Sequence, residues 1–246
     1  MFDSFKFDSA GNRLYPGKTV RTLEWDVFTD TALPSWLTFT NNDSANLTFS
    51  VTPMSAYGGD GFCKLQWSGT PSTSLASNLA LSFGFDLRQF HEVGFILKDV
   101  AVGTSLDATN KVDLTLAIHK YPNCGVWFKQ NATTQKMECR IYNTSGTDDF
   151  TDVPYQIAGS GFGLGRKNIG MALCNPSKTA YLLGGDTAPV CSYQPTHPNG
   201  ANSSWPVPAS SGQMPVMTLE VINKIGANDG SAWIKFSGVK AWFVTG

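Results

Sequence analysis

The sequence predicts an all-β protein, an antiparallel jelly-roll β-sandwich of two six- or seven-stranded sheets. Apolar and polar residues alternate with a period of two along most of the chain, and helical periodicity is nearly absent. Gly, Pro, Asn and Asp separate the alternating runs, as they do in sandwiches and barrels. The 246 residues fit one large β domain, because sandwiches of this length commonly share a single core.

Alternation assigns a strand to each of about thirteen short segments. Each contains β-branched or aromatic residues and ends at turn-forming residues. In chain order they are 20–28, 36–40, 46–52, 62–67, 79–86, 92–99, 112–119, 124–130, 137–143, 167–174, 216–223, 232–236 and 239–245. We expect helices of no more than one or two turns.

Two short connections have the residue types of hairpin turns, "NATTQK" (131–136) and "NKIGANDG" (223–230). A much longer irregular segment, 175–215, holds seven of the thirteen prolines. An unstructured connection of that length within a compact domain is usually functional or a crossover. It equally fits a solvated connection that wraps the edge of the sandwich.

Residues 1–19 precede the first predicted sandwich strand and carry Phe2, Phe5 and Phe7 with little else to bury them. An apolar arm without its own core often docks onto a neighbouring protein, although it can equally fold back onto its own sandwich. We therefore divide the chain into an N-terminal docking arm, whose three phenylalanines form an assembly contact, and a jelly roll over 20–246 that includes the long loop.

Composition excludes several classes of partner. Only 15% of the residues are charged, against about 25% in a typical soluble domain. The net charge is −1 and no Lys/Arg run occurs, so we expect neither a nucleic-acid partner nor an anionic membrane partner. No apolar run approaches the ~18 residues of a spanning helix. The start lacks the features of a secretory signal, so we expect synthesis in a cytoplasm without export.

The five cysteines are odd in number, form no C-x-x-C, and occur with only three histidines, so the spacing of a zinc finger is absent. We expect free thiols, buried as small apolar side chains. The alternative is a local disulfide, either Cys124–Cys139 or Cys174–Cys191.

The stretch "RTLEWDVFTD" (21–30) holds two carboxylates that invite a catalytic interpretation, Glu24 and Asp26. Alternate side chains of a strand share a face, so these two acids lie together, opposite Leu23 and Trp25, which we assign to the core. Such a pair fits either a catalytic site or a solvated strand face.

Laminarinase-type glycoside hydrolases, which share the concanavalin-like jelly roll, carry three acids on one strand. Glu24 and Asp26 match the first two, but the third position is Phe28, or Thr29 if a bulge intervenes. Asp30 lies roughly 20 Å along an extended strand from Glu24, whereas paired catalytic carboxyls lie about 5–9.5 Å apart. We therefore expect no catalysis here and expect the two acids to be solvated or paired with Lys or Arg. A glycoside hydrolase using Glu24 and Asp26 is the alternative.

Aromatic residues outside a regular core pattern are candidate sugar-binding groups, because sugar rings stack on flat aromatic faces beside polar groups. Trp127 is adjacent to Phe128 in one strand, so one of the two faces outward, and Tyr193 and Trp205 lie in segment 175–215. We predict glycan binding by Trp127, Tyr193 and Trp205; alternatively, these aromatics anchor the loop to the body. Four further tryptophans lie in alternating strands, where a core or half-buried rim position is expected: Trp25, Trp67, Trp233 and Trp242.

From Leu23, "LEWDVFTDTALPSWLTF" resembles the opening of concanavalin A-like (LamG-like) jelly-roll domains, with Asp26, Phe28, Thr29 and Trp36 in the places of its D-x-F-[ST] segment and following Trp strand. The close, "MTLEVINKIGANDGSAWIKFSGVKAWFVTG", resembles the last hairpin of that family, where a final strand returns beside the first. The likeness extends to such domains on bacteriophage minor tail and receptor-binding proteins, which also have few charges and a short docking arm.

The resemblance implies a concave face or loop rim that binds saccharide, and often a Ca²⁺ site. "YGGDGF" (57–62) and "NDG" (228–230) are the only candidates for calcium, and each equally fits a plain turn, so we assign no cofactor and no metal ligand. The expected function is that of a non-enzymatic virion (phage tail) protein attaching the particle to host-surface polysaccharide. Its arm would contact other tail proteins, and homo-oligomerisation stays open. A purely structural virion protein that mediates subunit contacts is a further alternative.

Overall fold

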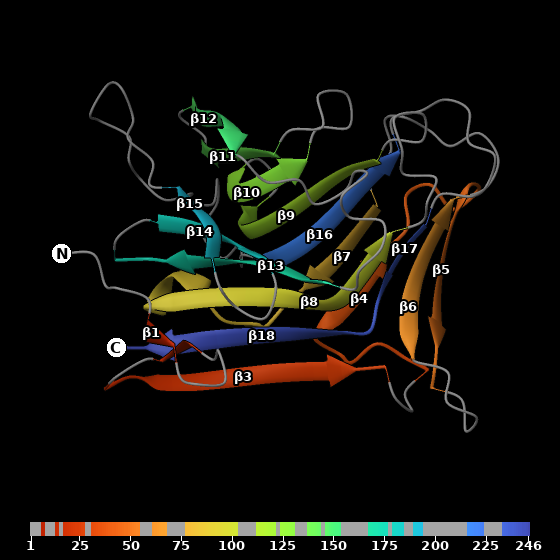
Figure 1. Cartoon of the computed structure of the whole chain (residues 1–246), viewed down its shortest axis with the longest axis horizontal. Helices are drawn as coiled ribbons and strands as arrows, with labels where there is room; N and C mark the ends of the chain where they lie inside the picture. Colours follow the sequence, from red (N-terminus) through yellow and green to blue (C-terminus); the bar gives the residue numbers. More distant parts are fainter. Residues whose placement is uncertain are drawn as a thin grey trace.

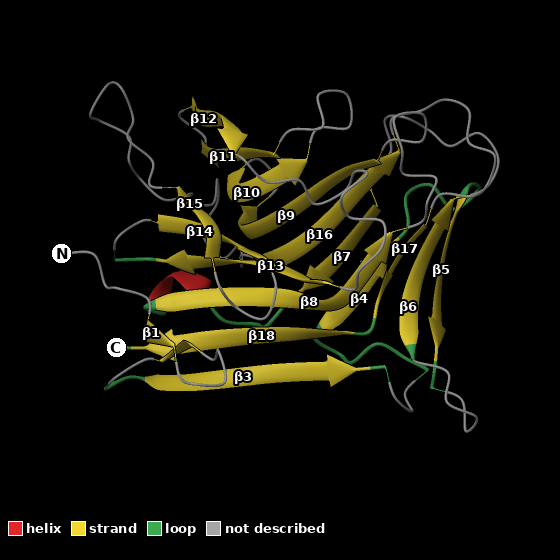
Figure 2. Ribbon diagram, in the orientation of Figure 1, coloured by secondary structure: helices red, strands yellow, loops and turns green. Residues whose placement is uncertain are grey.

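In the computed structural model, two antiparallel β-sheets face each other across a hydrophobic core (Figure 1). The structure describes residues 6–7, 13–14, 17–27, 31–54, 61–67, 77–102, 112–121, 124–130, 137–143, 146–153, 167–176, 179–184, 189–193, 216–223 and 233–246. Regular structure in these ranges is strand apart from one short 3₁₀ turn, η1 (Leu87–Gln89) (Figure 2). Every described strand pair is antiparallel.

The first sheet has seven strands in the described part of the chain. In spatial order they are β12 (Gly146–Val153), β11 (Met137–Asn143), β10 (Cys124–Gln130), β9 (Val112–Tyr121), β16 (Val216–Asn223), β7 (Ser77–Leu81) and β4 (Leu37–Thr40). A separate two-stranded ladder joins β1 (Lys6–Phe7) to β2 (Arg13–Leu14).

The second sheet has nine strands and divides along one edge. Its members are β15 (Pro189–Tyr193), β14 (Thr179–Gly184), β13 (Lys167–Cys174), β8 (Glu92–Val102), β17 (Trp233–Phe236), β6 (Phe62–Trp67), β5 (Leu47–Thr52), β18 (Gly238–Thr245) and β3 (Thr19–Asp26). Only Ser237 separates β17 from β18, and both pair with β8. On the side away from β8, β17 pairs with β6 whereas β18 pairs with β3. Strands β5 and β6 are therefore separated from β3 (Figure 1).

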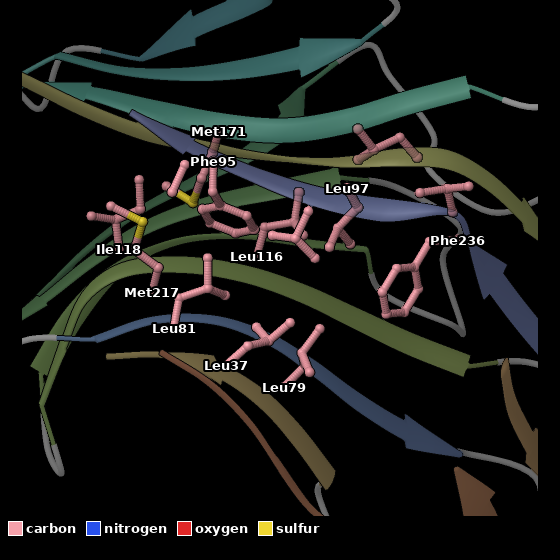
Figure 3. Packing of buried hydrophobic residues seen from close by; sticks show 14 of the residues in the cluster. Leu37, Leu79, Leu81, Phe95, Leu97, Leu116, Ile118, Met171, Met217 and Phe236 are labelled. Carbon is pink, nitrogen blue, oxygen red and sulfur yellow. The ribbon is translucent and has the colours of Figure 1, made fainter. Parts of the chain in front are cut away.

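The core lies between the two sheets and is formed by alternate side chains of their strands, as period-two alternation requires. One set comes from the seven-stranded sheet: Leu37, Leu79, Leu81, Leu116, Ile118 and Met217. The facing set comes from the nine-stranded sheet: Phe95, Leu97, Met171 and Phe236. Figure 3 shows the two sets pointing toward one another. Burial of these apolar surfaces is the main force that holds the sheets together.

A second, smaller apolar cluster lies on the other face of the nine-stranded sheet, and its buried members are Ile96, Ala172, Leu183, Trp242 and Val244. The Trp242 indole lies directly against Gly94, where an added Cβ would be 2.2 Å from its Cζ2 atom. The indole Nε1 donates a hydrogen bond to Oε1 of the buried Glu92, at 3.1 Å. Glycine at position 94 therefore makes room for a tryptophan that satisfies a buried carboxylate.

The all-β antiparallel prediction is confirmed, and a strand is present in each predicted segment. The largest difference at a predicted strand end is that β7 stops at Leu81 rather than 86; the backbone beyond it includes Gly84, at a φ of +71°.

Segment 175–215 was wrongly predicted to be irregular throughout, because it contains β14 and β15. In β14, Ala180 and Leu182 belong to the main core while Leu183 belongs to the second cluster, so both faces of the strand are buried. A strand buried on both faces shows no alternation, which removes the sequence signal. With these two strands the second sheet exceeds the predicted six or seven.

The hairpin prediction for 131–136 is confirmed, because β10 and β11 pair with Gln130 opposite Met137. The one for 223–230 is wrong: this segment links β16 in the seven-stranded sheet to β17 in the nine-stranded sheet. Turn residues mark the end of a strand but do not say in which sheet the next one lies. The final strand, β18, does lie beside β3, as the family resemblance implied.

Leu23 was wrongly assigned to the core, since its side chain is 36% exposed. The first six residues of β3 are exposed, and burial begins only at Trp25. Strand β3 extends beyond the core here, so alternation continues in the sequence where nothing covers the strand.

Candidate functional site

Glu24 and Asp26, the two candidate catalytic acids, are both bound by the ammonium group of Lys98. Its Nζ donates to Oε1 of Glu24 and, at 2.8 Å, to Oδ1 of Asp26. Lys98 lies on β8 and the acids on β3, with β18 between them. In register, Lys98 is opposite Gly238 and Gly238 is opposite Asp26. Because Gly238 has no side chain, Oδ1 of Asp26 can lie close above β18, where an added Cβ would be 2.5 Å away, and meet Lys98.

A β-bulge fixes the backbone beside Lys98. Asp99 adopts a φ of +49°, which is uncommon for a residue other than glycine. Its N–H donates to Oδ1 of Asn168 at 2.9 Å, and its carboxylate accepts a hydrogen bond from Oγ of Ser237 at 2.6 Å. The ladder between β8 and β13 is irregular at this level. Such bulges redirect a side chain, and this one holds the backbone from which Lys98 extends.

The electrostatics of this group favour charged side chains. The hydrogen bond from Lys98, together with its positive charge, holds the pKa of Glu24 below its ordinary value, against the opposing effect of partial burial. Burial lowers the pKa of Lys98, but its hydrogen bonds to Asp26 and Glu24 outweigh that effect and raise it overall. A general acid needs a pKa raised toward the working pH. The geometry therefore suits an ion pair that ties β8 to β3, and the position of the third family acid, Phe28 or Thr29, lies outside the described residues.

Two of the three predicted glycan-binding residues, Trp127 and Tyr193, lie in different sheets. Trp127 is in β10, opposite Ala117 and Arg140, in the seven-stranded sheet. Tyr193 is in β15, opposite Ala180, in the nine-stranded sheet. Trp205 lies outside the described residues. Their association in one site stays a prediction.

Of the predicted assembly contact, Phe7 lies in β1 opposite Arg13, and Phe2 and Phe5 lie outside the described residues. The cysteines can be placed in part: Cys63 and Cys174 are buried free thiols. A Cys174–Cys191 disulfide is therefore not formed, and Sγ of Cys174 instead lies 4.0 Å from Nε2 of His91.

The structure also reveals a surface that the sequence analysis did not single out. Phe62, Lys64, Trp233 and Lys235 are half-buried on the face of β6 and β17 that points away from the core, and we call them the aromatic-lysine strip. Their strand neighbours, including Leu65 and Ile234, are in the core. The sequence did hold an indication of this surface. Phe62 and Trp233 are aromatic, yet each lies at a position of an alternating strand where a polar, outward-facing residue is expected.

No group of three or more metal-ligating side chains occurs among the residues that the structure describes. Both proposed calcium turns fall mainly outside those residues. No helix in the described ranges is long and apolar enough to cross a membrane.

Solved structures resemble the chain over nearly its whole length, at low sequence identity. A protein of unknown function from Shewanella oneidensis has a TM-score of 0.57 and 9% identity, with 92% of this chain and 87% of that chain covered. The CBM2 module of the evolved Dit of Lactobacillus casei phage J-1 has a TM-score of 0.53 and 13% identity, with 93% and 98% covered. Arcelin-5, a lectin-like defence protein of Phaseolus vulgaris, has a TM-score of 0.52 and 8% identity, with 92% and 98% covered.

No family model and no curated protein sequence matches the chain. At the identities found, the structural likenesses establish the fold alone. They agree with the two facing antiparallel sheets. The chain therefore has the lectin-like, concanavalin A-like jelly-roll fold.

Proposed function

We propose that this chain is a non-enzymatic, carbohydrate-binding protein of a phage tail that attaches the virion to a host-surface glycan. The observation that carries the proposal is the likeness to the CBM2 module of a phage Dit, which spans 93% of this chain and 98% of that module. Lectin-like arcelin-5 shares the same fold at similar coverage. The low charge content, 15%, suits recognition through hydroxyl and amide groups.

The environment of the carboxylates supports binding over hydrolysis. Lys98 contacts both Glu24 and Asp26, and the pKa of Glu24 is lowered. A carboxylate in that state does not protonate a leaving-group oxygen near neutral pH. Purified protein is expected to release no sugar from cell-wall polysaccharide, and Glu24→Gln is expected to bind as the wild type does.

In this proposal Trp127, Tyr193 and Trp205 contact the glycan, while Phe2, Phe5 and Phe7 hold the domain to other tail proteins. The aromatic groups supply flat stacking faces for sugar rings. An apolar arm supplies the contact that keeps the domain in the particle.

The first test is co-sedimentation of the purified full chain with cell walls from a panel of bacteria, with and without EDTA. Saturable sedimentation with one wall type is expected, and loss of binding in EDTA would add calcium to the site. Absence of binding to every wall would overturn the proposal and favour a purely structural role.

Substitutions then locate the contact. Tyr193→Ala and Trp205→Ala are expected to abolish sedimentation without changing the midpoint of thermal unfolding. Met54→Ala is the control, because Met54 is an exposed apolar side chain, at 48%, and is not one of the proposed contact residues. Wild-type sedimentation by both aromatic variants would remove segment 175–215 from the site.

The arm has its own test. Deletion of residues 1–19 is expected to leave the jelly roll folded and able to bind walls, but absent from assembled particles. Particles that incorporate the truncated protein normally would exclude the arm as the assembly contact.

A further inference from the structure

The aromatic-lysine strip lies on a sheet face built by three neighbouring strands. Strand β6 pairs with β17 on one side and with β5 on the other. The core side of these strands is filled by Cys63, Leu65 and Phe236, which are at most 1% exposed. The strip lies on the opposite side, so its rings are not needed to fill the core.

The strip brings two positive charges together. Lys64 and Lys235 are directly opposite each other on adjacent strands, and like charges so placed repel. Both ammonium groups lie over aromatic rings: Nζ of Lys235 is 4.2 Å from the ring centre of Phe62 and 4.8 Å from that of Trp233, and Nζ of Lys64 is 5.9 Å from that of Trp233. The rings offset part of the repulsion through cation–π attraction. Within the described residues, no carboxylate forms a salt bridge with Lys64.

Polar side chains border the charges. Exposed Ser50 is opposite Lys64, exposed Thr48 is opposite Gln66, and Gln66 is opposite Trp233. On three neighbouring strands, β5, β6 and β17, this face therefore carries flat rings, hydroxyl and amide groups, and two adjacent cations. These are the groups that bind a sugar ring carrying a negative charge.

We propose that the aromatic-lysine strip binds an acidic saccharide. The sugar ring stacks on Trp233 or Phe62, its hydroxyls hydrogen-bond to the polar border, and its carboxylate or phosphodiester lies between Lys64 and Lys235. An anion in that position is attracted by both opposed lysines, which a neutral sugar is not. The inference rests on the proposed function and adds to it the charge of the glycan and a further set of contact residues.

A nucleic acid is the other polyanion that stacks on aromatic rings. A protein that binds one normally carries a basic stripe that follows the backbone, whereas this chain has a net charge of −1 and the strip has two lysines. The observations therefore favour a saccharide, whose charges are spaced by neutral rings.

Isothermal titration of the full chain tests the proposal with four probes: tetragalacturonate, a mannose tetramer joined by phosphodiester linkages, neutral galactotetraose and the oligonucleotide (dT)₈. We expect one or both acidic saccharides to bind at least tenfold more tightly than the neutral one, and to weaken as NaCl rises. Which of the two binds more tightly distinguishes a carboxylate from a phosphodiester as the recognised group.

Lys64→Gln and Lys235→Gln keep most of the side-chain length and remove the charge. Each is expected to weaken binding of the acidic saccharide about fivefold, and the double variant more than tenfold. Trp233→Ala is expected to weaken it about tenfold. Lys240→Gln, on β18 of the same sheet, is the matched control and is expected to stay within twofold of the wild type. Thermal unfolding of each variant separates lost contacts from lost folding.

The outcomes separate this inference from the proposed function. If the wild type sediments with cell walls but the lysine variants sediment equally well, the phage-attachment proposal stands and the strip is excluded. Equal affinity for neutral and acidic tetrasaccharides also overturns the inference, as does tighter binding of (dT)₈. If the wild type binds no wall and no saccharide, the proposed function and the inference both fail.

Discussion

Lys98 and Asp26 form a salt bridge across an intervening strand: Nζ of Lys98 lies 2.8 Å from Oδ1 of Asp26, although β8 and β3 both pair with β18 and not with each other. The same ammonium contacts Glu24. Gly238 lies between the two residues in register, and Oδ1 of Asp26 lies close above it, where a side chain at position 238 would otherwise stand. The resulting contact links the outer strand β3 to the centre of the sheet.

Removal of the ammonium group should change both the pKa of Glu24 and the stability of the fold. In Lys98→Gln, the pKa of Glu24 is expected to rise, because its hydrogen bond and positive neighbour are lost and Asp26 remains close. The free energy of unfolding should fall by about 1 kcal/mol, since these side chains are partly exposed and solvent screens the pair. Carboxyl-carbon NMR titration and urea unfolding measure the two effects. Lys240→Gln should shift the pKa of Glu24 less; an equal shift would contradict the assignment of Lys98 as its main partner.

The same ion pair predicts a pH dependence. Because the pKa of Glu24 is lower in the folded than in the unfolded protein, Glu24 stabilises the fold above its ordinary pKa, about 4.5, and that stabilisation is lost as pH falls through the folded value. For Lys98, whose pKa is raised, the contribution is present below about 10.5 and is lost as pH rises through the folded value. Urea midpoints from pH 3 to 7 should fall less steeply on acidification for Glu24→Gln than for the wild type. Parallel profiles would show that other carboxylates account for the acid sensitivity.

Gly238 should not tolerate even alanine. A Cβ at this position would lie 2.5 Å from Oδ1 of Asp26 and 2.5 Å from the backbone oxygen of Trp25. The carboxylate can rotate away, but the backbone oxygen belongs to the β3–β18 ladder, so one of the two strands must move. Gly238→Ala is expected to lower the free energy of unfolding by about 1–3 kcal/mol, as measured by urea unfolding. Gly246→Ala is the control, because its added Cβ has no neighbour within 4 Å; a similar loss in both variants would contradict the steric account.

The positions of most strands along the chain were predictable, but several strands and the arrangement of the two sheets were not. Segments such as 62–67 and 137–143 alternate so regularly that the observed strands have the predicted ends. By contrast, β14 buries side chains on both faces, which hides it from an analysis based on alternation.

The electrostatic partner of the acids was equally hidden. The sequence indicated that Glu24 and Asp26 share a face, but Lys98 is 72 residues from Asp26 in the chain. The two residues meet because both are in register with Gly238 on the intervening strand β18. Trp233 shows the same limit. Its strand was predicted, but that its ring shares a face with Phe62 and two lysines follows only from the pairing of β6 with β17.

Cys63 should be chemically inert in the folded protein. Its side chain is 0% exposed, and burial raises the pKa of its thiol to about 12. Because the thiolate is the reactive form, iodoacetamide at pH 8 is expected to leave Cys63 unmodified until urea unfolds the chain. Peptide mass spectrometry before and after unfolding measures this, with the unfolded sample as internal control. Rapid labelling under native conditions would show that the core opens locally at β6.

Trp242 should contribute more to stability than Trp233, although both are tryptophans of the same nine-stranded sheet. Trp242 is 8% exposed, and its Nε1 donates a hydrogen bond to the buried carboxylate of Glu92 at 3.1 Å, whereas Trp233 is half-buried. Trp242→Phe removes a donor to a buried acceptor, which costs about 1–3 kcal/mol, and leaves unfilled volume over Gly94. Urea unfolding should show a loss of that size for Trp242→Phe and a loss below about 1 kcal/mol for Trp233→Phe, because a half-buried side chain outside the core loses little packing when it becomes smaller. Equal losses would mean that the Glu92 hydrogen bond adds nothing to the stability of the second cluster.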